Sequence, residues 1–319
     1  MGPRARRVKI LTGKAKRASR PDFGRDCAAP AGANSGLCVA GGSGVECDPG
    51  SENRGADMAG VEGRVALVTG AGSAGGIGYA TARILAERGA LVAITSTTAR
   101  IRERLDELPG PASGKAAFVA DLMRPNAAIE LAAHVSKALG PIAILVNNAG
   151  MVQVGRKERA SRFEKIDDAE WDTAIARNLT TAFRMTRAVL PAMYRRGYGR
   201  IVHISSVTGP VVSNPNATGY STAKAGMLGM TRSLAIEAGP KGVTVNAIGP
   251  GWIKTAASRR EEIVAGENTP MGRPGTPEEI GHVAAFLASE EASYLSGQLI
   301  VVDGGNTIQE YKGPSESYY

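Results

Sequence analysis

The sequence predicts an α/β protein built on a doubly wound parallel sheet of seven strands, with helices on both faces. Three observations support this fold class. Short apolar runs of strand length recur along the chain, helical segments of ten or more residues separate them, and a glycine-rich loop follows the first run. Strands that are apolar on both faces are typical of a sheet covered on each side, and such sheets bind ligands beyond the carboxyl ends of their strands.

Seven segments are expected to form the strands. In chain order they are residues 64–69 (RVALVT), 91–96 (LVAITS), 116–121 (AAFVAD), 142–147 (IAILVN), 200–205 (RIVHIS), 243–248 (VTVNAI) and 299–304 (LIVVDG). The first helix is expected directly after the glycine loop, in the stretch IGYATARILAERG. The sequence therefore predicts a single Rossmann-type domain over residues 58–308, followed by a short polar tail at 309–319.

Residues 1–57 differ in composition from the rest of the chain. They hold 10 Lys and Arg against 6 Asp and Glu, are rich in Gly, Ala, Pro and Ser, and lack an apolar period, so we expect disorder. Three interpretations stay open. The segment is an organelle-targeting presequence, because no acid precedes Asp22, or a basic arm for nucleic acid or membrane, or the product of a start assigned too early. We favour the last, because Met58 stands just before the first strand.

Charge and cysteine content exclude several functions for the domain. Of the net charge of +8, half belongs to residues 1–57, which leaves no nucleic-acid footprint on the domain. All three cysteines, Cys27, Cys38 and Cys47, lie in the first segment at spacings that match no zinc pattern, so thiol catalysis and disulfides are excluded from the body. No run approaches the roughly 18 apolar residues of a membrane span. This composition suits a cytoplasmic enzyme.

No metal site is predicted. The chain has three histidines, His134, His203 and His282. We interpret all three as structural, because they show no metal-ligand grouping.

The stretch TGAGSAGGIG (69–78) is a candidate phosphate-binding loop. It lies between a strand and a helix, where glycines let the backbone come close to a diphosphate and the helix N-terminus attracts it. A glycine-rich turn without a ligand would look the same, so the interpretation needs further motifs.

Four further features occur in order along the chain. They are NNAG (147–150) after the fourth strand, Asn178 in ARNLTTAF, YSTAK (220–224) with Ser206 fourteen residues before its tyrosine, and GPGWIKT (249–255). With the loop, they resemble the short-chain dehydrogenase/reductase family, single-domain branch, and most closely its 3-oxoacyl-[acyl-carrier-protein] reductases. The resemblance runs from about Gly63 to Asn306. The family has three residues between TG and GIG and this chain has five, so we expect a bulge at residues 73–75.

Tyr220 and Lys224 are four residues apart and share one face of a helix. A tyrosine has a pKa of about 10 and is a poor acid at neutral pH, but a nearby ammonium stabilises the phenolate and lowers that pKa. Tyr220 could then exchange a proton with a carbonyl oxygen. The resemblance implies that Lys224 also holds the nicotinamide ribose, that Ser206 binds the carbonyl oxygen, and that Asn178 anchors a water in the proton relay.

Two related chemistries are excluded by spacing. Enoyl reductases of this superfamily place the lysine seven residues after the tyrosine, and that residue is Met227 here. The 95 residues after Lys224 are too few for the substrate domain of the sugar-nucleotide epimerase branch. The sequence therefore favours interconversion of carbonyl and alcohol.

NADP is favoured over NAD as the cofactor. The second strand ends in Thr95 and Ser96, followed by Thr97 and Thr98, without the acid that would bind a ribose 2′-OH and repel a 2′-phosphate. Asp121 is expected at the adenine, although it could also cap the next helix. The full set expected at the cofactor is Gly70, Ser73, Gly76, Ile77, Gly78, Ser96, Thr97, Asp121, Leu122, Asn148, Ala149, Gly150, Tyr220, Lys224, Pro250, Gly251, Ile253 and Thr255.

The substrate is expected between residues 151–167 and the loop after Pro250, which carries Trp252. The resemblance suggests a 3-oxoacyl thioester and fatty acid biosynthesis; another small ketone, a sugar or a secondary metabolite stays open, as does a catalytically idle cofactor-binding scaffold. An acyl carrier protein is a candidate partner. Its expected contacts are Arg195, Arg196 and Lys241, which an ordinary charged surface explains equally well. The family also implies a homotetramer, with helices around residues 179–190 and 223–238 at its interfaces. The charge distribution and the lack of a long apolar run predict no nucleic-acid or membrane partner.

Overall fold

The computed structural model describes residues 60–150 and 160–310. The predictions for residues 1–57 and for nearly all of the 309–319 tail lie outside these residues. The same holds for most of the substrate segment expected at 151–167. The following description concerns the α/β unit alone.

The predicted sheet is confirmed. Seven strands, all parallel, lie in the order β3-β2-β1-β4-β5-β6-β7. They are β1 (Val65–Val68), β2 (Leu91–Ser96), β3 (Lys115–Val119), β4 (Ile144–Asn147), β5 (Gly199–Ile204), β6 (Val243–Pro250) and β7 (Leu299–Val302). Each overlaps the segment predicted for it. β1, β4, β5 and β6 are buried on both faces, as expected for the central strands of a covered sheet.

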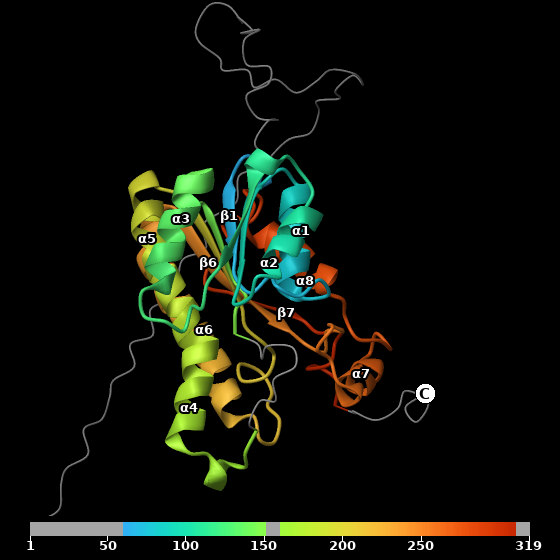
Figure 1. Cartoon of the computed structure of the whole chain (residues 1–319). Helices are drawn as coiled ribbons and strands as arrows, with labels where there is room; N and C mark the ends of the chain where they lie inside the picture. The colour runs from blue at the N-terminus through green and yellow to red at the C-terminus, as the bar shows by residue number, and fades with distance from the viewer. Residues whose placement is uncertain (1–59, 151–159, 311–319) are drawn as a thin grey trace, which may run out of the picture. The chain divides into compact units, whose positions relative to one another are not determined.

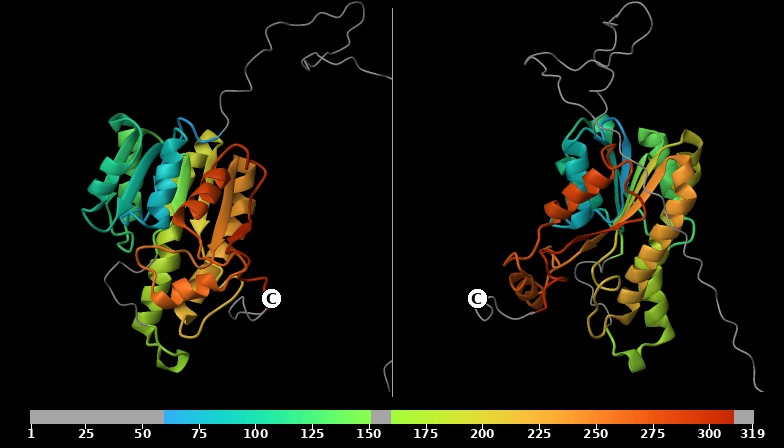
Figure 2. Two further views of the ribbon diagram at one scale, coloured as in Figure 1. Left: turned by 90° about the vertical axis from the view of Figure 1, so that its right-hand side faces the viewer. Right: turned by 180° about the vertical axis from the view of Figure 1, so that it is seen from behind.

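Eight α-helices accompany the sheet in the described part of the chain. They are α1 (Ile77–Glu87), α2 (Ile101–Glu107), α3 (Ala127–Leu139), α4 (Asp168–Ile175), α5 (Thr181–Arg196), α6 (Thr218–Ala238), α7 (Arg260–Glu267) and α8 (Pro277–Leu287). Helices α1, α2 and α8 cover one face of the sheet, and α3, α5 and α6 cover the other (Figures 1 and 2). Each layer buries its own apolar cluster, centred on residues such as Ile84 and Ile280 in the first and Leu131 and Met185 in the second.

The helical path between α4 and α5 is continuous but widened. A single π-helical turn, Ala176–Thr180, joins the two helices and has Asn178 at its centre. Such turns commonly mark functional positions, because they displace one side chain from the regular helical track.

The strand order reverses at β1. In the chain β4 comes after β3, but in the sheet it pairs with β1, on the side opposite β2. The loops after β1 and β4 therefore diverge to opposite faces and leave a crevice at the carboxyl edge, the usual ligand position in such sheets. Helices α4 and α7 extend past this edge (Figure 1).

Candidate active site

The glycine loop after β1 is held in place by close backbone contacts. Gly70 has φ +71°, a conformation that favours glycine, and a Cβ there would stand 2.8 Å from the Cα of Ala149. A Cβ on Gly78 would lie 2.7 Å from the carbonyl oxygen of Gly70. These two glycines therefore let the loop, the start of α1 and the segment after β4 pack against one another.

The bulge that the sequence predicts at residues 73–75 takes the form of a turn. Ala74 and Gly75 are the corner of that turn, which the amide of Gly76 closes by donating to the Ser73 oxygen at 3.1 Å. Helix α1 then begins at Ile77, and its N-cap residue Gly76 offers no side-chain acceptor. On the far side of the turn, the Ala256 amide donates to the Gly75 oxygen at 3.4 Å. The lengthened loop thus reaches the segment that follows β6.

The NNAG segment is tied to the glycine loop by a residue that the sequence analysis did not single out. The hydroxyl of Thr69, fully buried, accepts hydrogen bonds from the amides of Asn148 and Ala149, both at 3.0 Å. The Asn148 side chain donates to the carbonyl oxygens of Thr69 and Gly70 at 3.1 and 3.0 Å. From the sequence, Thr69 could be recognised only as part of the TG pair, because no local pattern indicates its contact with the amides of Asn148 and Ala149.

Ser206, Tyr220 and Lys224 come from β5 and α6, which adjoin each other at the carboxyl edge. Ser206 follows β5, and its hydroxyl accepts from the Thr208 amide at 3.0 Å. Tyr220 lies in the first turn of α6 and is half-buried, with the Lys224 ammonium 5.6 Å from its ring centroid. The expected shared face of these two residues is therefore present.

Lys224 is almost wholly buried, with 3% of its surface exposed. Its ammonium donates to the carbonyl oxygen of Ile204 at 2.8 Å, and its own backbone oxygen accepts from the Ser205 hydroxyl at 3.0 Å. Burial lowers the pKa of the lysine from 10.5 to about 8, because the charged form loses hydration. The group is still mostly cationic at neutral pH, so it can stabilise a phenolate beside it.

Asn178 reaches the same region from the π-helical turn. It is fully buried, and its Nδ2 donates to the Ala174 oxygen at 3.0 Å, while its Oδ1 has no hydrogen-bond partner in the described chain. That oxygen lies 3.2 Å from the position of a Cβ on Gly150. The structure therefore brings Asn178 beside the end of NNAG.

The segment after β6 is anchored on both sides. A Cβ on Gly251 would stand 2.5 Å from the Cβ of Asp303, so only glycine fits there. Ile253 forms an isolated parallel bridge with Gly275. The Thr255 amide donates to the Ser258 hydroxyl at 2.9 Å, which shapes the turn that meets the glycine loop.

The residues expected at the adenosine fit that role only in part. Ser96 packs against Gly72, where a Cβ would lie 2.7 Å from the serine Cβ, and its hydroxyl donates to the Thr98 oxygen at 3.0 Å. Thr95 is not part of a phosphate pocket, because it is buried and donates to the Phe118 oxygen. Asp121 accepts from the Met123 amide at 3.0 Å within the turn before α3, and Leu122 is buried. Asp121 does not cap that helix, whose N-cap residue is Asn126.

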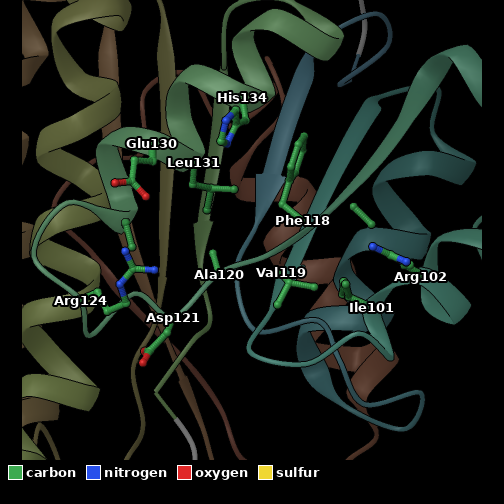
Figure 3. Close-up of a pocket in the computed structure, with 12 residues that line it drawn as sticks. Ile101, Arg102, Phe118, Val119, Ala120, Asp121, Arg124, Glu130, Leu131 and His134 are labelled. Atoms are coloured by element: carbon green, nitrogen blue, oxygen red, sulfur yellow. The ribbon is translucent and has the colours of Figure 1, made fainter.

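A hollow of about 310 Å³ lies beside the edge strand β3 rather than at the catalytic residues. Phe118 and His134 stand at one end of it and Asp121 and Arg124 toward the other (Figure 3). Asp121 is the only lining residue that belongs to the expected site, so this hollow is distinct from the crevice.

The basic residues expected at a carrier protein do not flank the crevice. Arg195 and Arg196 end α5 just before β5 begins, and Lys241 precedes β6 by two residues. In a parallel sheet all strand starts share one edge, so these residues lie at the edge opposite Tyr220. Arg196 also donates to the Ile142 oxygen. The sequence shows only that these three residues lie near active-site helices. It does not indicate which edge of the sheet they occupy.

The loop residues fit a dinucleotide. The first amides of α1, on Ile77 and Gly78, and the Ser73 amide find no acceptor among the described residues, and the glycine cradle would be filled by any Cβ at Gly70 or Gly78. Open amides at a helix N-terminus bind anions such as a diphosphate. Within residues 60–150 and 160–310, no three His, Cys, Asp or Glu side chains come together as metal ligands. In the same residues, no helix has the length and apolarity needed to cross a bilayer.

Residues 70–307 match a family model described as enoyl-(acyl carrier protein) reductase. This chain belongs to the short-chain dehydrogenase/reductase family. It is thus an oxidoreductase that acts on CH–OH or C=O groups with a nicotinamide cofactor. Met227, the position at which the sequence analysis looked for an enoyl reductase lysine, is fully buried.

Relatives in the family carry several functional names. The chain is 40% identical over 250 residues to nodulation protein G of a Rhizobium strain, covering 76% of this chain and 96% of the relative. It is 39% identical over 250 residues to the 3-oxoacyl-[acyl-carrier-protein] reductase FabG of Vibrio harveyi, covering 77% and 98%. A solved structure from Agrobacterium tumefaciens, provisionally assigned as a gluconate dehydrogenase, matches with a TM-score of 0.70 and 33% identity, covering 78% of this chain and 97% of that one.

Proposed function

We propose that this short-chain dehydrogenase/reductase uses NADP to interconvert a ketone and a secondary alcohol, and that its substrate is a 3-oxoacyl thioester. The observation that supports the chemistry most strongly is the buried Lys224 ammonium beside the half-buried Tyr220, at the carboxyl edge of the sheet. The presence of all four catalytic candidates (Asn178, Ser206, Tyr220 and Lys224) argues against a catalytically idle scaffold.

The residues divide the work between proton transfer and positioning. Tyr220 donates a proton to the carbonyl oxygen during reduction, or removes it from the alcohol in reverse. Lys224 stabilises the phenolate that remains, and it can do so without drawing in water because its own surroundings are dry. Ser206 donates a hydrogen bond to the same carbonyl oxygen. Asn178, with its unpartnered buried Oδ1, holds a water that returns protons to Tyr220.

The cofactor is proposed to lie along the edge from the end of β3 to α6. Its diphosphate would be held by the open amides of Ser73, Ile77 and Gly78 and by Thr255. Its adenosine would be held by Ser96, Thr97 and Asp121. When bound, the nicotinamide supplies or accepts the hydride. The uncharged end of β2 supports NADP, because nothing there repels a 2′-phosphate.

The 3-oxoacyl assignment draws support from the reductases among the relatives. A carrier-bound substrate would have to dock at the crevice side, and Arg195 and Lys241 are too remote to guide it. A sugar-acid substrate is the second candidate, favoured by the solved structure assigned to gluconate oxidation. We also propose that the enzyme works in the cytoplasm.

The test is to follow NADPH absorbance with purified protein and a panel of a 3-oxoacyl thioester, a cyclic ketone, a quinone and, in the oxidative direction with NADP⁺, gluconate. Turnover confined to the thioester would support the proposal, and oxidation of gluconate would move the protein to sugar metabolism. The control is Tyr220→Phe, which should lower kcat at least about 100-fold while NADPH still binds. NADPH binding without turnover of any compound would favour the scaffold.

A further inference from the structure

A second network, made of buried polar side chains joined by hydrogen bonds, lies close to Lys224. His203, the fifth residue of β5, is fully buried and pairs in register with Asn147, the last residue of β4. The Asn147 Nδ2 lies 3.1 Å from the His203 Nδ1 and donates to the Thr186 hydroxyl of α5 at 3.0 Å. These three residues take no part in the proposed proton transfer.

The network touches both halves of the candidate site. On one side, Asn147 is followed by Asn148 and Ala149, whose amides bind Thr69 of the cofactor loop. On the other, His203 is followed by Ile204, whose oxygen receives the Lys224 ammonium. The side-chain bond between Asn147 and His203 therefore joins the two strand ends that carry the cofactor loop and the catalytic lysine.

The hydrogen bonds determine the state of the ring. The Asn147 amide nitrogen is a donor, so the His203 Nδ1 must be an acceptor and the proton must reside on Nε2. A protonated ring could not accept this bond, and it would place a second positive charge close to Lys224. Burial, and then the charge of Lys224, lower the pKa of His203 from 6.5 to about 4, so the ring is neutral at physiological pH.

The Nε2 atom of His203 indicates that filling space is not the only role of this side chain. It is buried and has no hydrogen-bond partner among the described residues. An unsatisfied buried N–H costs about 1–3 kcal/mol, so an apolar side chain would be the cheaper way to fill the space. What an apolar side chain would lack is the acceptor for Asn147.

We propose that His203 is a positioning residue that acts through Lys224: its neutral imidazole, held by Asn147, keeps the end of β5 in register with the end of β4, so that the Ile204 oxygen stays in place for the lysine ammonium. This inference rests on the proposed function for its kinetic consequence, but the contacts that it invokes can be measured without turnover.

Two substitutions separate the acceptor from the rest of the ring. His203→Asn can place its Oδ1 near the position of Nδ1 and so keeps the acceptor, whereas His203→Leu removes it. For the compound that the wild-type enzyme turns over, we expect His203→Leu to lower kcat about tenfold with the KM for the carbonyl compound changed less than about twofold. His203→Asn should restore kcat to within about twofold of wild type.

Thr231→Val is the matched control for buried damage. Thr231 is also fully buried, on α6 about two helical turns beyond Lys224, and the substitution removes only its bond to the Met227 oxygen. Its kcat should equal that of wild type even if its thermal stability falls as far as that of His203→Leu. Equal kcat in His203→Leu and wild type, or an equal loss in His203→Asn and His203→Leu, would overturn the proposal.

Nuclear magnetic resonance of the full-length protein tests the same contacts without substrate. The ¹⁵N spectrum of His203 should show the Nε2–H form from pH 8 down to pH 5. The pKa of Lys224 should fall further in His203→Leu, because its ammonium loses a well-placed acceptor, and stay unchanged in His203→Asn. A ring that titrates near pH 6.5, or a Lys224 pKa that is unaffected in His203→Leu, would contradict the inference even in an active enzyme. Absence of carbonyl turnover with both signals as expected would instead contradict the proposed function alone.

Discussion

At the scale of single residues, the site depends on one positively charged side chain that is buried away from water. Lys224 donates to Ile204 and lies beside Tyr220, and it has little access to water. Desolvation makes its ammonium less stable than in the unfolded chain, where the lysine pKa is about 10.5. The fold therefore accepts a cost in stability so that a positive charge stands next to the tyrosine.

This cost predicts how stability varies with pH. Between pH 8 and pH 10.5 the unfolded chain keeps a proton on this lysine that the folded protein has lost, so the free energy of unfolding rises with pH there, by up to about 3 kcal/mol. Below pH 8 both states are protonated and the cost is fully present. Urea unfolding of the cofactor-free protein across this range should show the rise, and Lys224→Met should lack it. Identical slopes in the two proteins would contradict the buried-cation description.

Cofactor preference is also predicted to depend on one residue. Ser96 ends β2 beside Gly72, where a carboxylate would repel a 2′-phosphate and accept a bond from a 2′-hydroxyl. Ser96→Asp should lower kcat/KM for NADPH about 100-fold and raise it for NADH, as measured by initial rates with each cofactor. Ser96→Asn is the control of equal size without charge. If both variants lose NADPH activity equally, packing rather than charge determines the preference.

At the scale of elements, the lengthened glycine loop links two segments that follow different strands. Its turn at Ala74 and Gly75 accepts a hydrogen bond from Ala256, in the segment after β6. These two segments flank the proposed diphosphate position. The contact therefore gives the two extra residues a structural consequence that their sequence alone does not reveal.

Shortening the loop tests that consequence. Deletion of Ala74 and Gly75 removes the contact with Ala256, and we expect NADPH to dissociate about tenfold faster in stopped-flow fluorescence. Gly75→Ala is the matched control, because the nearest atom to its added Cβ is 3.6 Å away, an ordinary contact. An unchanged dissociation rate in the deletion variant would mean that the turn does not retain the cofactor.

At the scale of the whole molecule, α5 and α6 present apolar side chains that the described chain leaves uncovered. Phe183 is 45% exposed and Ile236 is 79% exposed. Both lie within the helices predicted to form subunit interfaces, and exposed apolar side chains of this size often mark such contacts.

We therefore predict a homotetramer that these helices help to hold. Phe183→Glu combined with Ile236→Glu should give a smaller species in sedimentation velocity, because carboxylates would be buried unpaired at the interface. Ile129→Glu on α3, where the native side chain is 56% exposed, is the control and should leave the assembly unchanged. A wild-type monomer, or a double variant of wild-type size, would contradict the prediction.

Much of this molecule could be predicted from local pattern. Apolar runs of strand length identified all seven strands of the sheet, because strands covered on both faces bury mainly apolar side chains. The spacing of Tyr220 and Lys224 predicted their shared face, because helical geometry brings residues four apart together. Gly76 at the start of α1 followed from glycine and helix-start rules.

Contacts between distant segments could not be predicted in this way. Thr69 binds residues 79 and 80 positions away, Thr95 faces Phe118 rather than a phosphate, and Arg195 and Lys241 lie at the far edge of the sheet. His203 was interpreted only as structural, since its partner Asn147 is 56 positions away in the sequence. The sequence by itself determined the elements, their order and the reactive groups, because these depend on composition and short-range spacing. Only the tertiary structure decided which of those groups meet, which are desolvated and which edge they occupy, because strand order and burial arise from packing across the whole sheet.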